Sequence, residues 1–163
     1  MKKLFLTLLM LLPLSLMAQK VAVVNTEDVI TKLPEYNAAL KELQDLSTKY
    51  QADMKSMEDE LNSKMEAFVK ERDGLVESIR NRRQQEIQDI QTRFQQSYQT
   101  MQEDLQKRQQ ALMAPIQQKV ADTIKKVGDE NGVAYIMEHG MMLYTGPSAV
   151  DLTQAVKTKL NIK

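Results

Sequence analysis

Few side chains in this 163-residue sequence could carry out a chemical step. His139 is the only histidine, and the chain has no cysteine, so thiol catalysis and disulfide bonds are excluded. We expect a turn at His139, and no partner pattern supports a catalytic triad or a zinc site there. The motifs GxxxxGK followed by Ser or Thr, GxGxxG and HExxH are absent. The acidic pairs Glu58/Asp59 and Asp129/Glu130 fit solvated helix or loop. The sequence therefore predicts no catalytic residue, no metal site and no cofactor.

Methionine is the first residue type that suggests binding rather than catalysis. Met54, Met57 and Met65 recur in one segment, and Met101 stands in a later one. The flexible thioether side chain adapts to many shapes and recurs on surfaces that bind varied partners. The same spacing also fits the apolar seam between two helices, and both interpretations stay open.

Three arginines, Arg80, Arg82 and Arg83, stand within four residues and would form a positive tip at the end of a helical arm. Such a cluster is either a solvated helix face or an electrostatic contact with acidic partners or anionic lipid head groups. The whole chain balances 22 basic against 22 acidic residues. It lacks the basic excess of a general nucleic-acid-binding protein, and we expect no nucleic-acid partner.

The first 18 residues have the pattern of a secretory signal peptide. Lys2 and Lys3 precede an apolar run from Leu4 to Leu16 that is too short for a typical membrane span. Ala18 supplies the small residue after which cleavage is expected, and no cysteine follows it for lipid attachment. We therefore expect an exported, soluble protein of a bacterial periplasm.

A helical pattern dominates the middle of the chain. Residues 35–114 contain no proline and one glycine, Gly74, and apolar residues recur about every 3.6 positions. Segments 34–72 and 76–114 are equally long and flank Asp73-Gly74. Equal arms around one turn predict a long antiparallel coiled-coil hairpin over 34–114, with the turn near 73–75. A single helix through Gly74 is the alternative, because one glycine costs only about 1 kcal/mol.

The remaining segments, 19–33 and 115–163, predict a small base. Strands are expected at about 20–25, 133–138 and 141–145, with a tight hairpin turn at His139-Gly140. A helix that continues past Pro115 is expected to end at Gly128, and a last helix is expected at about 151–161, capped by Ser148 or Asp151. Such a base is marginal as a core and leaves apolar strand edges exposed, so the sequence predicts an oligomer.

Together these segments resemble the Skp/OmpH family of periplasmic chaperones. The resemblance covers Gln19 to Lys163 and rests on KVAVVN, the long Gln-, Glu-, Lys- and Arg-rich hairpin and the ending VAYIMEHGMMLYTGPSAVDLTQAVKTKLNIK. It implies an α+β, mostly helical fold in a jellyfish-like homotrimer, with strands of three chains in a small β-barrel body and three hairpins hanging from it. The cavity between the hairpins would hold unfolded outer-membrane β-barrel proteins without ATP.

The residue patterns give candidates for client binding and for oligomerisation. The client-binding candidates are Met54, Met57, Met65, Phe68, Ile79, Phe94 and Met101. The oligomerisation candidates are Val21, Val23, Val133, Tyr135, Met137, Met142 and Tyr144. The alternative to a holdase is a structural coiled-coil spacer or scaffold of the cell envelope. Arg83 and Arg108 interrupt the apolar stripe, which together with the methionines favours adaptable arms over a stiff spacer.

Overall fold

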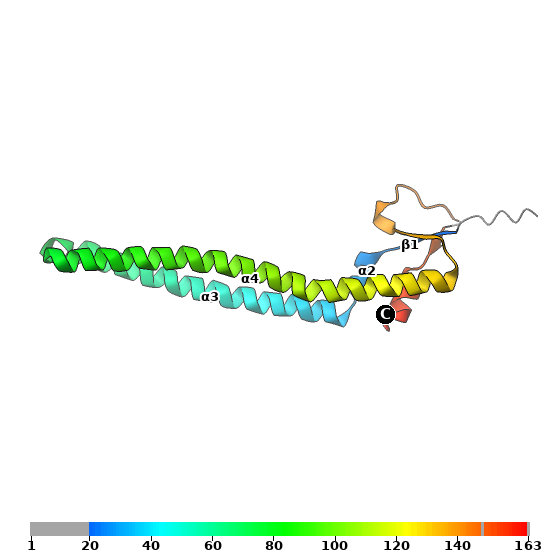
Figure 1. The fold of residues 1–163 in the computed structure, drawn as a ribbon, viewed down its shortest axis with the longest axis horizontal. Coiled ribbons are helices and arrows are strands. Elements are labelled where there is room, and N and C mark those ends of the chain that lie inside the picture. Colours follow the sequence, from blue (N-terminus) through cyan, green and yellow to red (C-terminus); the bar gives the residue numbers. More distant parts are fainter. Residues whose placement is uncertain (1–19, 148, 163) are drawn as a thin grey trace, which may run out of the picture.

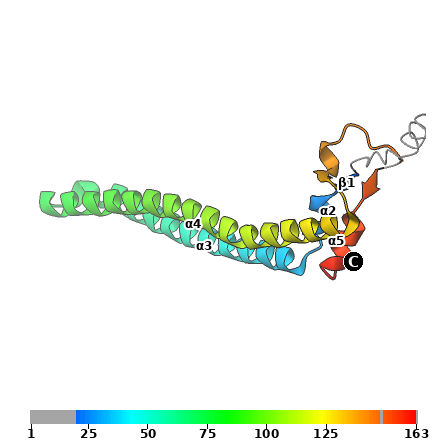
Figure 2. The same ribbon diagram turned by 45° about the vertical axis from the view of Figure 1, so that its right-hand side comes forward.

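A long helical hairpin attached to a small body makes up this protein (Figure 1). The computed structural model describes residues 20–147 and 149–162, so the expected signal peptide at 1–18 lies outside it. Helices α3 (Pro34–Glu71) and α4 (Glu77–Asn131) lie side by side, and the strands and short helices gather at one end of the pair (Figure 2). The predicted helical hairpin is present. Within the described residues, no helix is long and apolar enough to cross a membrane.

Local sequence explains where α3 begins and ends. Pro34 occupies its first position, where the fixed φ suits the helix and the missing N–H removes no hydrogen bond. The helix runs for 38 residues, about 57 Å at 1.5 Å per residue. A short 3₁₀ turn, η2 (Arg72–Gly74), and an extended residue, Leu75, then reverse the chain. The chain therefore turns back, and α4 runs alongside α3.

Helix α4 is longer than the expected second arm, because it runs through Pro115 without ending. Proline has no N–H to donate, so the carbonyl of Ala111 lacks its usual helical partner. The last turns of α4 pass into the body, where Ile116, Val120 and Val127 are buried. One continuous helix thus spans both the arm and the base.

The expected helix end at Gly128 is wrong, since α4 continues to Asn131 and Gly132 caps it. Gly132 has a left-handed φ of 61°, which glycine adopts without steric cost. Its N–H donates to the carbonyl of Asp129, and the N–H of Val133 donates to that of Gly128. Gly128 instead provides close packing, because a Cβ there would lie 2.8 Å from Cδ1 of Ile136.

The sheet contains three parallel strands in the order β2-β1-β3. Strand β1 (Val21–Val24) is central and leads directly into helix α2 (Thr26–Ile30). Strand β2 (Tyr135–Glu138) pairs with it on one side, and the two-residue β3 (Val150–Asp151) pairs with it on the other. Both neighbours of β1 come from the last 30 residues of the chain.

The expected strand at 141–145, with its hairpin turn at His139-Gly140, is wrong. A 3₁₀ turn, η3 (His139–Met141), follows β2, and an irregular segment leads on to β3. A two-residue β-hairpin needs a positive φ in its turn, but among the described residues only Gly132 and Asn161 have one. Both carboxylate oxygens of Glu138 lie 3.2 Å from the N–H of Thr26, which fixes the end of β2 beside α2 instead.

One face of the sheet packs on helices to form the core of the body. Ala22 and Val24 of β1 have no exposed surface, and they pack with residues of α2, α4 and the last helix, α5 (Thr153–Lys159). The structure shortens the helix expected at 151–161, and Asp151 Oδ1 accepts the N–H of Thr153 at 2.8 Å. The core is small because the strands and the helices α2 and α5 that form it are short.

A buried ammonium ties α5 to α2. The side chain of Lys157 is only 7% exposed, and its Nζ donates to Oδ2 of Asp28. This hydrogen bond, helped by the positive charge of Lys157, lowers the pKa of Asp28 below its ordinary 3.8. The same contact raises the pKa of Lys157. Both shifts favour the ionised pair in the folded state.

We expect Asp28→Asn to destabilise the protein at neutral pH and to have little effect in strong acid. The pKa of Asp28 is depressed on folding, so its contribution is complete above the unfolded value of 3.8 and is lost as the pH falls through the folded-state value. Urea unfolding of both proteins, from neutral pH to well below pH 3.8, measures the difference in unfolding free energy. A difference that stays constant into strong acid contradicts the assigned ion pair.

Candidate functional site: the helical arms

A ladder of polar contacts joins α3 to α4 along the length of the hairpin. From base to tip the linked pairs are Glu35–Lys119, Glu42–Arg108, Tyr50–Asp104, Glu60–Arg93, Lys64–Glu86 and Glu71–Arg83. Residue numbers rise on α3 as they fall on α4, as two helices running in opposite directions require. These side chains are largely exposed, and exposed ion pairs contribute only about 0–1 kcal/mol each. The ladder therefore aligns the helices more than it stabilises them.

The apolar residues between the helices are mostly only half covered. In the fully described stretch from Leu40 to Leu112, Ile90 is the one buried residue, at 6% exposure. Met54, Met101 and Phe94 are partly exposed. Two isolated helices share a single line of contact, which cannot remove the apolar stripe of each from water. The arms thus keep accessible apolar surface along their length.

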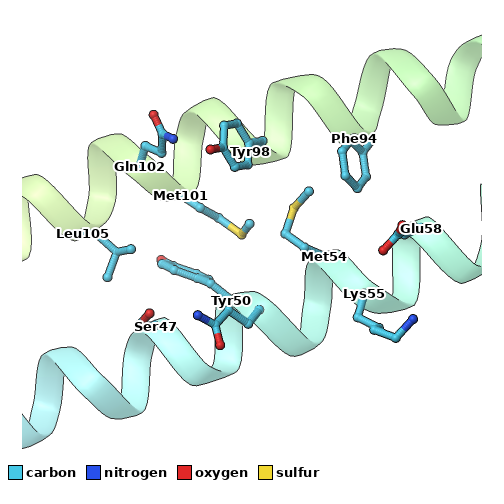
Figure 3. Close-up of a pocket in the computed structure, with 11 residues that line it drawn as sticks. Ser47, Tyr50, Met54, Lys55, Glu58, Phe94, Tyr98, Met101, Gln102 and Leu105 are labelled. Atoms are coloured by element: carbon cyan, nitrogen blue, oxygen red, sulfur yellow. The ribbon is translucent and has the colours of Figure 1, made fainter.

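A groove of about 600 Å³ opens halfway along the hairpin (Figure 3). We call it the mid-arm groove, and its apolar lining consists of Tyr50, Met54, Phe94, Tyr98, Met101 and Leu105. Figure 3 shows Tyr50 and Met54 from α3 and Met101 from α4 reaching into the space between the helices. Polar side chains such as Lys55 and Glu58 stand at its edge. The groove can take apolar or aromatic side chains without enclosing them.

Tyr50 links the mid-arm groove to the ladder. Its hydroxyl donates to Oδ2 of Asp104 at 2.5 Å, and this hydrogen bond raises the pKa of Tyr50. Tyr50 lines the groove while its hydroxyl is bound to Asp104. Tyr50 therefore presents an apolar surface in a fixed position.

A second groove of about 390 Å³, the tip groove, lies near the turn. Met65, Phe68, Val69 and Arg72 line it from the first arm and its turn, and Arg80, Gln84, Ile87 and Gln88 line it from α4. Met65 is 41% exposed and Val69 is 73% exposed, so apolar surface is accessible here as well.

The structure distributes the predicted client-binding residues over both grooves. Met54, Phe94 and Met101 line the mid-arm groove, and Met65 and Phe68 line the tip groove. Met57 and Ile79 are half-exposed elsewhere on the hairpin. The prediction did not include Tyr50, Tyr98 and Leu105, although all three lie on the apolar stripe that predicts the arms.

Carboxylates neutralise much of the predicted basic tip. Arg83 Nη1 lies 2.5 Å from Oε2 of Glu71 across the turn, and Arg82 lies 3.8 Å from Glu86. Arg80 differs from both, since its Nη2 donates to the carbonyl of Leu75 at 3.1 Å. The cluster is therefore not a uniform positive surface, and its three members have different surroundings.

The body exposes several apolar side chains of the sheet and of the segment that follows it. Val21 pairs with Tyr135 and Val23 with Met137, which places the four on the sheet face opposite the core. Three of them are 42–59% exposed, whereas Val23 is buried at 3%. Tyr144 is 80% exposed, Met142 is half-exposed and Val133 packs against the core of the body. Within the described residues, no group of His, Asp and Glu could hold a metal ion.

A search of solved structures found a protein of similar fold. The chain superposes with a TM-score of 0.76 on a crystal structure of a proposed OmpH-like outer membrane chaperone from Caulobacter crescentus CB15, at 14% identity and over 86% of this chain and 83% of that one. This likeness defines the class of fold, a helical hairpin on a small strand-containing body. The sequence matches the OmpH-like outer membrane protein family over residues 20–160, and the chain belongs to this family. A comparison with curated proteins gave no significant match.

We expect the buried residues of the hairpin to contribute more to its stability than the partly exposed residues that line the grooves. Ile90→Ala should destabilise the arms by about 2 kcal/mol or more, because it removes a buried side chain. Met101→Ala should cost less, since Met101 is already partly exposed. Native-state amide hydrogen exchange along α3 and α4 measures both effects. Equal loss of protection in the two variants would contradict this division.

Proposed function

We propose that this protein is an ATP-independent periplasmic holdase, not an enzyme, that binds unfolded outer-membrane β-barrel proteins between helical arms and prevents their aggregation. The observation that carries the proposal is the mid-arm groove, in which methionine and aromatic side chains remain partly exposed between two helices. Membership of the OmpH-like family supports a chaperone role. The expected signal peptide at 1–18 supports the periplasmic location.

The chemistry of the grooves suits a client without fixed structure. Methionine side chains adjust to different partners, so one surface can accept many sequences. Each contact is weak, but several contacts on one chain add by multivalency, because the first raises the effective concentration for the next. Such binding needs no nucleotide, since release follows when the client folds or meets a stronger partner.

We further propose that the working form is a homotrimer assembled through the body. The sheet face with Val21, Tyr135 and Met137 is the apolar surface that a second copy would cover, and Leu143 and Tyr144 of the body are also exposed. Contiguous apolar surface of this kind commonly marks an interaction site. In a trimer, three hairpins would enclose a cavity lined by their grooves.

The trimer can be tested with charges placed on this face. Tyr135→Asp combined with Met137→Asp should disperse the oligomer, because carboxylates would be buried at the interface without partners. Val133 is unsuitable for this test, since it packs in the core of the body itself. Light scattering gives the mass, and Gln95→Asp with Gln99→Asp on the exposed arm surface is the matched control. An unchanged mass in the Tyr135/Met137 variant would sink the assignment of this face.

Holding can be tested by diluting an unfolded outer-membrane β-barrel protein from urea with and without the mature chain and without nucleotide. We expect the chain to suppress aggregation, and Met54→Ser with Met101→Ser to require roughly threefold more protein for the same effect, because apolar contact area is lost. Gln91→Ser with Gln95→Ser is the control, since these residues are exposed and outside the groove. A folded oligomer that fails to suppress aggregation would favour the alternative, a structural spacer of the cell envelope.

A further inference from the structure

The tip groove has two chemically different sides. Met65, Phe68 and Val69 of α3 form an apolar wall. Arg80, Gln84 and Gln88 of α4 are spaced four residues apart, so they line up along one face of that helix beside the wall. A ligand in this groove meets mainly apolar groups from α3, whereas α4 offers hydrogen-bonding groups beside the apolar Ile87.

Arg80 is the member of the tip cluster without a carboxylate partner. Arg72, Arg82 and Arg83 each form an ion pair, whereas Arg80 forms none with the described residues. Its Nη2 is held by the carbonyl of Leu75 at 3.1 Å, and its buried Nε has no hydrogen-bond partner. A buried donor without an acceptor is costly, and a guanidinium group pairs best with an anion. The Nε atom is covered, but Arg80 as a whole lines the groove and is only partly buried, so the exposed part of its guanidinium group can pair with a negative group there.

Gln84 and Gln88 fit the backbone of an extended peptide. Residues four apart on a helix lie about 6 Å apart, and residues two apart in an extended chain lie about 6.6 Å apart. Each glutamine offers both a donor and an acceptor, as each peptide group does. An acyl chain has no such groups along its length, so these amides favour a polypeptide over a lipid.

We propose that the tip groove is a subsite for an extended segment of an unfolded protein in which an apolar side chain contacts Met65 and Phe68 and an acidic side chain two residues away pairs with Arg80. The proposal rests on the proposed function, because the segment belongs to a client. The tip groove would then prefer client segments that carry an acidic and an apolar residue two positions apart, whereas the mid-arm groove binds apolar side chains in general. Alternate residues of an extended chain point the same way, so both side chains can face the groove.

The test compares two capped peptides of alternating Ser and Thr, each with one Phe and, two residues later, either Asp or Asn. Each peptide carries a neutral dye, and fluorescence anisotropy measures its affinity for the mature chain. We expect roughly fivefold tighter binding of the Asp peptide, as a partly exposed charge pair supports. Equal affinity of the two peptides for the unaltered protein would overturn the proposal.

Arg80→Gln should reduce this ratio to about one, and so should Gln84→Glu, which leaves the Arg80–Leu75 contact in place and repels a carboxylate. The matched control is Arg82→Gln, because Arg82 is exposed and does not line the groove. A merely structural role of Arg80 in the turn would weaken both peptides equally and leave the ratio unchanged. That result would also overturn the proposal.

Two further measurements separate the proposals from each other. If the unaltered chain suppresses client aggregation but binds both peptides equally, the subsite is wrong and the holdase proposal stands. Vesicles containing anionic lipid form the second comparison. Binding of these vesicles that is lost in Arg80→Gln, without discrimination between the peptides, would show that the groove takes lipid rather than polypeptide.

Discussion

Two helices that lie side by side can cover each other along one line only, and the other properties of the arms follow from this limit. Neither arm has a third helix to complete its core, so the apolar stripe that folds the hairpin is also partly exposed in it. Ile90 shows how little of the stripe is buried. The polar ladder compensates by fixing the alignment of the helices from the outside, and it leaves the space between Met54 and Met101 open. Alignment and accessibility are thus carried largely by different side chains, and Tyr50 takes part in both.

The continuity of α4 joins these arms to the body. The same helix supplies Phe94 and Met101 to the mid-arm groove and Ile116 and Val120 to the core of the body. Pro115 lies between these two parts and removes one backbone hydrogen bond without interrupting the helix. Pro115 also lines a groove of about 370 Å³, to which three alanines, Ala38, Ala39 and Ala111, contribute. The arm is therefore joined to the body by one helix that lacks a backbone hydrogen bond near the point where the two parts meet.

Sequence periodicity predicts the long elements well because their contacts are local. The helical hairpin could be inferred from the apolar stripe, the single central glycine and the flanking prolines. Local periodicity could not establish the strand at 141–145, because strand pairing depends on segments that are distant in the chain. In the structure, β3 at Val150 pairs with β1 on that side of the sheet. Gly128 and Gly132 look equivalent in sequence, but only the second has a left-handed φ, while the first admits Ile136. The net charge of the tip could not be predicted from the local sequence either, because Glu71 of the opposite arm neutralises Arg83.

The position of β1 at the centre of the sheet also determines the order in which the protein can assemble. Val21–Val24 precedes both long helices in the sequence, and both of its partners, at 135–138 and 150–151, follow them. A polypeptide that emerges with its N-terminus first has no partner for this strand until nearly all of it has appeared. The helices need no such wait, since their hydrogen bonds join residues four apart, and their closure brings the two ends of the chain together at a lower entropic cost. The arms can therefore form first, and the sheet face that carries Val21, Tyr135 and Met137 is completed only after residues 135–138 have joined β1.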